Sequence, residues 1–159
     1  MAAGIKMNLA ILFWLYKEPE LCRHRVQHLR RYNSQTPIYA LFGGDSKDAP
    51  KYEAALRDYI DDFYVFDEPP PPGADGSISE FRGGVHWKYL YGDLLISSWY
   101  KHRGKKFEWD TIVVVQWDML LFGAISEVFS CLEKDQILLS GLRPIREVES
   151  NWAWVTPKN

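Results

Sequence analysis

Short apolar runs and longer amphipathic stretches alternate along the chain. Apolar runs between turn formers predict buried strands, and apolar positions three and four residues apart predict helices. The predicted strands are residues 8–16, 37–42, 62–66, 111–115 and 136–140. The predicted helices are residues 18–32, 49–59, 85–102 and 125–132. This order predicts a three-layer, Rossmann-like α/β fold, with a mainly parallel sheet, right-handed crossovers and helices on both faces.

The most informative segment is a β-branched run from Thr111 to Val115, which is followed by polar residues and by Asp118. A run that is apolar on both faces is typical of a central strand in a sheet covered on both sides. In such folds, ligands bind just past the carboxyl ends of the strands. Asp118 is therefore placed to hold a metal ion or a ligand hydroxyl, or else it only begins a turn.

The helical patterns predict which side chains are solvated and which are buried. The predicted helix over residues 18–32 presents a basic face that is expected to be solvated. The longest predicted helix covers residues 85–102. Cys22 and Cys131 lack metal or redox spacing and lie in apolar helical patterns, so we expect buried thiols. The basic face consists of Arg23, Arg25, Arg30 and Arg31. The apolar stripe of the longest helix consists of Trp87, Leu90, Tyr91, Leu94, Leu95 and Ser98.

A proline-rich stretch, residues 68–84, predicts a loop longer than most loops of compact domains. It leaves from the ligand side of the third predicted strand. Two interpretations stay open for it, a cover over the site and a simple insertion.

Charge and hydropathy narrow the classes of partner. The formal net charge is -2 over 159 residues, which provides no electrostatic case for binding nucleic acid or an anionic membrane. The apolar stretch at residues 9–16 is far short of the roughly 20 residues that span a bilayer, and no small-residue cleavage site follows it. We therefore expect a single domain over residues 1–159, no transmembrane segment and a cytoplasmic location.

The strand ends of a parallel sheet share one rim, and the residues that follow the predicted strands are chemically varied. An aromatic wall for a base, carboxylates for ribose hydroxyls and cations for phosphate would suit a nucleotide. Arg82, His86 and Lys88, at the start of the longest helix, are expected to face the same rim. The strand-end residues are Tyr16, Lys17, Gly43, Gly44, Asp45, Asp67, Gln116, Trp117 and Asp118.

Other sites receive little support from the sequence. There is no glycine-rich dinucleotide fingerprint, no Walker loop and no Gly-X-Ser-X-Gly elbow. His24 and His28 are four residues apart and could bind zinc from one helix face. No third ligand is suggested, so a solvated basic face is the preferred interpretation.

These features together resemble the nucleotide-sugar-binding half of GT-A glycosyltransferases over residues 8–142. Lys88 precedes an apolar strand that Asp110 opens and Asp118 follows, and a short helix comes next. In that family the strand ends in Asp-X-Asp, which binds a divalent cation and, with it, the diphosphate. The resemblance implies Mn²⁺ or Mg²⁺ at Asp118, a nucleotide-sugar donor and an unknown acceptor. It implies donor-binding roles for Tyr16, Lys17, Asp45, Asp67, Lys88, Gln116 and Trp117.

Two departures from the family pattern leave the activity open. The first motif position is Gln116, which can offer an amide oxygen but no charge. After Ser140 only 19 residues follow, among which Glu147 and Glu149 are acidic candidates by position alone. We thus expect that residues 1–159 lack a full acceptor half. The chain would then be a fragment, a minimal enzyme or a domain that binds sugar nucleotides without turnover. The main alternative is a non-catalytic binding module.

A third interpretation is an unrelated α/β enzyme, such as a phosphotransferase that uses a strand-end aspartate. It predicts an acyl phosphate at Asp118. The residue two positions after Asp118 is Leu120 rather than a second acid, which counts against this chemistry.

Overall fold

The computed structural model describes residues 7–70, 88 and 91–132. The strands in this part of the chain are Leu9–Leu15 (β1), Ile38–Phe42 (β2), Asp62–Val65 (β3) and Thr111–Gln116 (β4). The helices are Pro19–Tyr32 (α1), Ala49–Leu56 (α2), Gly92–His102 (α4) and Ile125–Val128 (α5). Short 3₁₀ turns occupy Ser46–Asp48 (η1) and Gly104–Lys106 (η2). The strands begin and end within two residues of the predicted positions.

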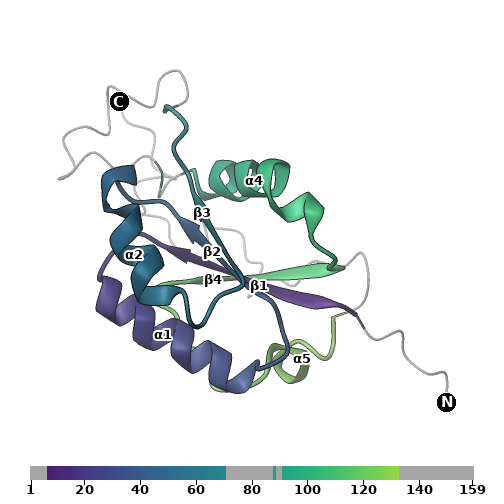
Figure 1. Cartoon of the computed structure of the whole chain (residues 1–159). Coiled ribbons are helices and arrows are strands. Elements are labelled where there is room, and N and C mark those ends of the chain that lie inside the picture. The colour runs from purple at the N-terminus through teal and green to yellow at the C-terminus, as the bar shows by residue number, and fades with distance from the viewer. Residues whose placement is uncertain (1–6, 71–87, 89–90, 133–159) are drawn as a thin grey trace, which may run out of the picture.

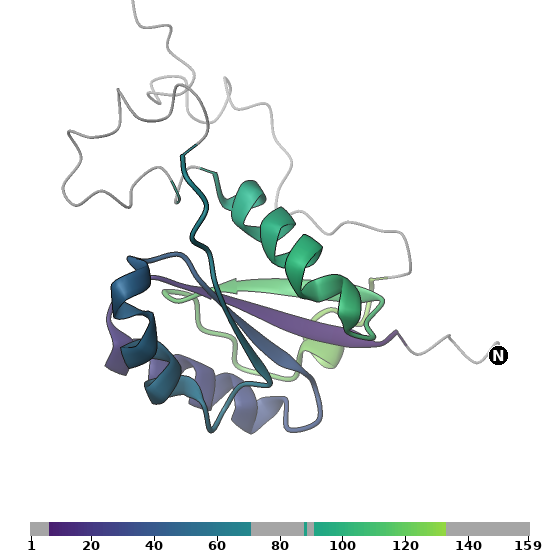
Figure 2. The same ribbon diagram turned by 45° about the horizontal axis from the view of Figure 1, so that its top comes forward.

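The sheet is parallel throughout its described strands, which lie in the order β3-β2-β1-β4. Helices α1 and α2 cover one face and α4 covers the other (Figures 1 and 2). The short helix α5 packs on the α1 side through Ile125, which is fully buried. The predicted three-layer α/β fold is thereby confirmed.

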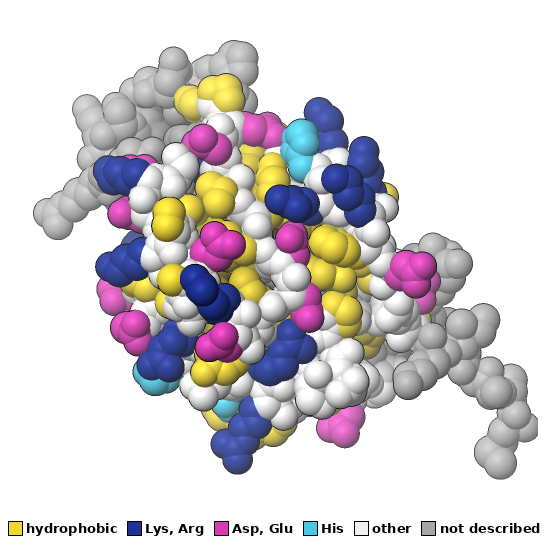
Figure 3. Space-filling model, viewed as in Figure 1, with side chains coloured by type: hydrophobic (Ala, Val, Ile, Leu, Met, Phe, Trp, Pro, Cys, Tyr) yellow, Lys and Arg dark blue, Asp and Glu magenta, His cyan; other side chains and the backbone are white. Residues whose placement is uncertain are grey.

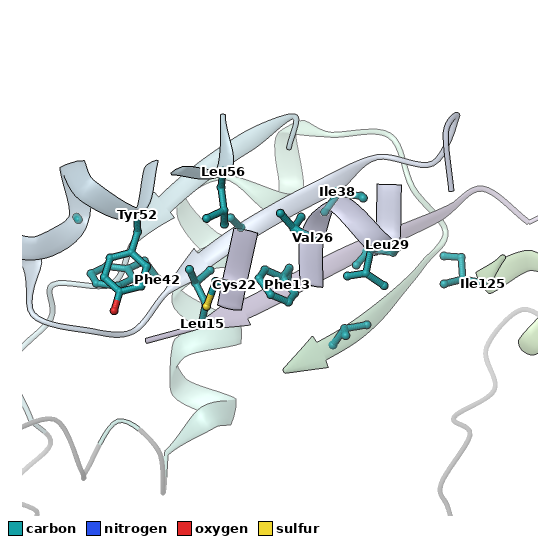
Figure 4. Close-up of a cluster of buried hydrophobic side chains, with 14 residues drawn as sticks. Phe13, Leu15, Cys22, Val26, Leu29, Ile38, Phe42, Tyr52, Leu56 and Ile125 are labelled. Carbon is teal, nitrogen blue, oxygen red and sulfur yellow. The ribbon is translucent and has the colours of Figure 1, made fainter. Parts of the chain in front are cut away.

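Side chains of β1 alternate between two hydrophobic clusters because successive residues of a strand point to opposite faces. Figure 4 shows the first cluster, where β1 meets α1, α2 and β2. Towards α1 and α2, β1 contributes Ile11, Phe13 and Leu15. Towards α4 it contributes Ala10, Leu12 and Trp14. Both faces of β1 are therefore buried, as expected for a central strand.

Helix α1 begins at Pro19, a residue suited to a first turn because it lacks an amide hydrogen. Its buried residues, Cys22, Val26 and Leu29, follow the predicted helical spacing. The prediction that Arg30 belongs to a solvated face was wrong. Arg30 Nε donates to the Tyr59 carbonyl at 3.0 Å, and other guanidinium nitrogens bind the Thr36 carbonyl and Asp61. Arg30 therefore ties the end of α1 to the chain that enters β2 and β3.

The prediction of one helix over residues 85–102 was also wrong. Helix α4 begins at Gly92, and Tyr91 before it has φ −110° and ψ 46°, outside the helical region. With 11 residues α4 is shorter than α1, which has 14. Leu95 and Ser98 of the predicted stripe are buried, Tyr91 is exposed, and Trp87 and Leu90 lie outside the described residues.

Strand β4 differs from the central strand that its composition predicted. Within the described part of the sheet it pairs with β1 alone, and only Val115 among its residues is buried. The predicted fifth strand at residues 136–140 falls outside the described residues, as do residues 71–84 of the proline-rich loop. Cys131 is exposed rather than buried, because the helix predicted to carry it ends at Val128.

None of the helices within residues 7–70, 88 and 91–132 has the length and apolar character needed to cross a bilayer.

Candidate functional site

The carboxyl ends of the four described strands lie along one rim of the sheet. Adjacent strands are about 4.8 Å apart, so the ends of β3 and β4 are separated by about 14 Å. The backbone pairing continues one residue past three of these strands, which holds the following residues in place. In these hydrogen bonds, the backbone amides of Gly43, Phe66 and Trp117 donate to the carbonyls of Leu15, Phe42 and Trp14, respectively, each at 2.9 Å.

The strand order divides the predicted site residues into two groups. Asp67 follows β3 and Asp45 follows β2, and the Lys88 ammonium lies between the ends of these two strands. The second group lies at the ends of β1 and β4 and consists of Tyr16, Lys17, Gln116, Trp117 and Asp118. Lys88 binds at the junction of β2 and β3, and the end of β1 lies between β2 and β4, the strand that Asp118 follows.

Lys88 makes the most specific contacts of the first group. Its Nζ donates to the carbonyl oxygens of Gly44 and Phe66, both at 3.0 Å. The same nitrogen lies 5.4 Å from the centroid of the Phe66 ring. An ammonium has three donors, so these bonds leave one for another partner.

Burial lowers the pKa of Lys88, and the charges of Asp67 and Asp45 partly oppose this effect. Asp45 already has partners of its own. Its carboxylate accepts from the Lys47 amide at 3.1 Å and pairs with Lys47 Nζ at 2.8 Å. Hydrogen bonds from Lys47 lower the pKa of Asp45. Asp45 thus caps the turn η1 and is exposed at the rim, as is Asp67.

The second group presents aromatic surface. The rings of Tyr16 and Trp117 meet edge to face, with centroids 5.8 Å apart. Lys17 Nζ lies 5.6 Å from the centroid of the Tyr16 ring. Trp117 Nε1 is buried and has no hydrogen-bond partner among the described residues. The ends of β1 and β4 therefore combine ring surface with a cation.

Asp118 lies in a turn just past β4. The Met119 amide donates to the Gln116 carbonyl at 3.0 Å, which closes a four-residue turn with Trp117 and Asp118 at its corner. The Asp118 side chain is exposed and Gln116 is half-buried. Asp118 is therefore both a turn residue and an accessible carboxylate.

A divalent cation at this position would need ligands from a bound molecule. Within the described part of the chain, no three His, Cys, Asp or Glu side chains lie together so that they could hold a metal. Magnesium sites often use one or two carboxylates together with substrate phosphates, and an exposed Asp118 fits that arrangement. The described residues thus fit a cation shared with a diphosphate, but not one held by the protein alone.

The histidine pair of α1 has a different setting from the one a zinc site needs. His28 Nε2 donates to the Leu121 carbonyl at 2.9 Å, and its ring makes edge contacts with the rings of Tyr32 and Phe122. His28 therefore fastens the segment after β4 onto α1.

The sequence did not single out Trp14, a buried residue of β1 next to the rim. Its side chain is buried at the end of β1, and two glycines lie against its ring. A Cβ atom on Gly43 would come within 3.0 Å of Trp14 Nε1 and 2.9 Å of Leu95 Cδ2. The available signal was a large aromatic residue at the end of a strand, with a glycine pair after the next strand.

A polar network beside the rim was also missed. The Ser98 hydroxyl donates to the Glu68 carboxylate, and the hydroxyls of Ser98 and Tyr64 are 2.9 Å apart. His102 Nε2 lies 3.8 Å from the same carboxylate. The network binds the chain that leaves β3 to helix α4. Its two halves, Tyr64 with Glu68 and Ser98 with His102, lie in separate parts of the chain, so no local pattern indicates the contact between them.

Figure 3 shows acidic and basic side chains interspersed with apolar surface across the face that carries α2, β3 and α4.

Comparison with known proteins adds no assignment, because no family model matches the chain and no curated protein matches it.

Proposed function

We propose that this chain is a glycosyltransferase-type domain that binds a nucleoside-diphosphate sugar through Mn²⁺ or Mg²⁺ and passes the sugar to an acceptor. The observation that carries the proposal is the serial arrangement of groups along one parallel-sheet rim. Asp67, Asp45 and Lys88 lie at one end, and Tyr16 and Trp117 with the Asp118 turn lie at the other. A nucleotide sugar has uncharged hydroxyl and amide groups at one end and a charged diphosphate further along, so it suits a rim that varies in this way.

Each group of the rim has a chemical role in this proposal. Asp45 and Asp67 accept hydrogen bonds from ribose hydroxyls or from the base, and the ring surface of Tyr16 stacks on a planar or sugar ring. Lys17 is exposed and supplies charge for phosphate. Asp118, which is exposed, holds the cation together with the diphosphate, and Gln116 two residues before it can offer an amide oxygen. A bound cation would offset the charge that develops on the leaving diphosphate.

Calorimetric titration with UDP and GDP, with and without Mn²⁺, tests the proposal. We expect one nucleotide to bind, with an affinity that rises when Mn²⁺ is added. Asp118→Ala should weaken Mn²⁺-dependent binding by about tenfold or more, equivalent to about 1.4 kcal/mol. Asp58→Ala is the matched control, because Asp58 is an exposed acid away from the rim. The proposal fails if neither nucleotide binds the wild type, or if Asp118→Ala changes nothing.

A second candidate is a module that binds the nucleotide sugar without turnover. Gln116 favours it, because an uncharged amide weakens the hold on a cation compared with a second carboxylate. Measuring nucleotide-sugar hydrolysis and transfer separates the two candidates. A rate that Asp118→Asn abolishes would rule out the non-catalytic module, whereas nucleotide binding with no detectable rate would favour it.

A further inference from the structure

The bonds of Lys88 are directed at the protein backbone rather than at open solvent. Its ammonium is bound by the carbonyls of Gly44 and Phe66. Each of these residues immediately precedes a rim aspartate, Asp45 in one case and Asp67 in the other. Lys88 therefore links two neighbouring strand ends at the points from which both carboxylates emerge.

The surroundings of this ammonium do not suit a phosphate. Two of its three donors are occupied, and the Phe66 ring lies 5.4 Å from the nitrogen. A phosphate at the remaining donor would also approach the negative charges of Asp45 and Asp67, which interact with Lys88. Lys47 pairs with Asp45, so the two lysines only balance the two carboxylates and leave no surplus positive charge for a phosphate. The local charge therefore favours a neutral ligand group that donates hydrogen bonds.

We infer that Lys88 is a positioning residue, which fixes the ends of β2 and β3 so that Asp45 and Asp67 meet the nucleoside part of the donor. This inference rests on the proposed function and narrows the role that the sequence suggested, an approach to phosphate or to the ribose side. Lys88 acts through the two carbonyls and does not touch the diphosphate. The diphosphate lies instead towards β1 and β4, where Lys17 and Asp118 are exposed.

Dissecting the ligand tests this division of the rim. Titrations of wild type and Lys88→Met would use three probes: UDP or GDP, the corresponding nucleoside, and inorganic pyrophosphate with Mg²⁺. We expect the affinities for nucleotide and nucleoside to fall by the same factor, about tenfold for the loss of a charged hydrogen-bond donor. The affinity for pyrophosphate should not change. A role in overall folding alone would not separate the probes in this way.

Two further variants keep the experiment decisive. Lys51→Met removes one exposed lysine of α2 and controls for the change in net charge. Lys88→Gln keeps an amide donor and replaces Lys88→Met if that variant does not fold, with the same separation of probes expected. Urea denaturation of each variant checks that the titrated protein is folded.

The outcomes are distinguishable. A fall in pyrophosphate affinity with nucleoside affinity unchanged would overturn the inference and assign Lys88 to phosphate. Equal losses for all three probes, or no loss for any, would also overturn it. If the wild type binds no nucleotide, the proposed function itself fails, and that result appears before any Lys88 variant is measured.

Discussion

Gly92 lies directly against the indole ring of Trp14, and a Cβ atom at Gly92 would come within 2.7 Å of Trp14 Cη2. This contact brings the start of α4 onto the carboxyl end of β1. Just before this contact the backbone of Tyr91 lies outside the helical region, so α4 begins at Gly92.

Gly92→Ala is expected to destabilise the protein, although alanine has the higher helix propensity. Alanine in a helix is favoured over glycine by up to about 1 kcal/mol, but forcing a methyl group into a packed contact costs about 1–3 kcal/mol. The cost of the clash should exceed the gain in helix propensity, and urea denaturation would measure the fall in the free energy of unfolding. Trp14→Phe in the same chain should recover part of the loss. A more stable Gly92→Ala variant would show that the ring moves aside freely.

The two cysteines should react at very different rates. Burial, with a contribution from the charge of Glu18, raises the pKa of Cys22 to about 12, and its Sγ donates to the Lys17 carbonyl. Cys131 is exposed. An aromatic disulfide reagent at about pH 8 should therefore modify one thiol quickly and the second only on unfolding, because the thiolate is the nucleophile. Cys131→Ser should remove the fast phase and Cys22→Ser should keep it. Two fast thiols would contradict this arrangement.

The buried side chain of Asn33 is expected to stabilise the packing of the segment after β4. Its Oδ1 accepts from the Ile125 amide at 2.8 Å, and its Nδ2 donates to the Leu29 carbonyl at 2.9 Å. Asn33→Ala would leave the Ile125 amide buried without a partner, at a cost of about 1–3 kcal/mol. Chemical denaturation checks the value, with Ser34→Ala as an exposed neighbouring control. Equal stabilities for the two variants would exclude this role.

The lowered pKa of Lys88 predicts a pH dependence with a definite sign. Below its folded pKa, Lys88 is charged in both states and its burial penalty is fully present. Between the folded pKa and the ordinary value of 10.5, the unfolded chain binds more protons, so stability rises with pH. The stability of wild type relative to Lys88→Met should therefore increase as the pH approaches 10.5. If the stability difference between wild type and Lys88→Met is flat or falls over this range, burial is not the dominant influence on the pKa of Lys88.

Much of the fold was predictable from local pattern. The strands β1 to β4 were predicted to within two residues because a buried apolar run is visible in the sequence itself. The boundary at Gly92 was not, because it depends on Trp14, a residue far away in the chain. Arg30 was misjudged for the same reason. Its helical position looks solvated, and its partners Tyr59 and Asp61 belong to another part of the chain.

For the candidate site, the sequence by itself determined which residues follow the strands, because a strand and the turn after it are local features. Only the tertiary structure decided which of those residues become neighbours. The strand order sets Lys88, Asp45 and Asp67 apart from Asp118, and it directs the Lys88 ammonium to two backbone carbonyls. The physical reason is that strand pairing and hydrogen bonds between distant elements depend on how the whole chain packs. No run of neighbouring residues contains that information.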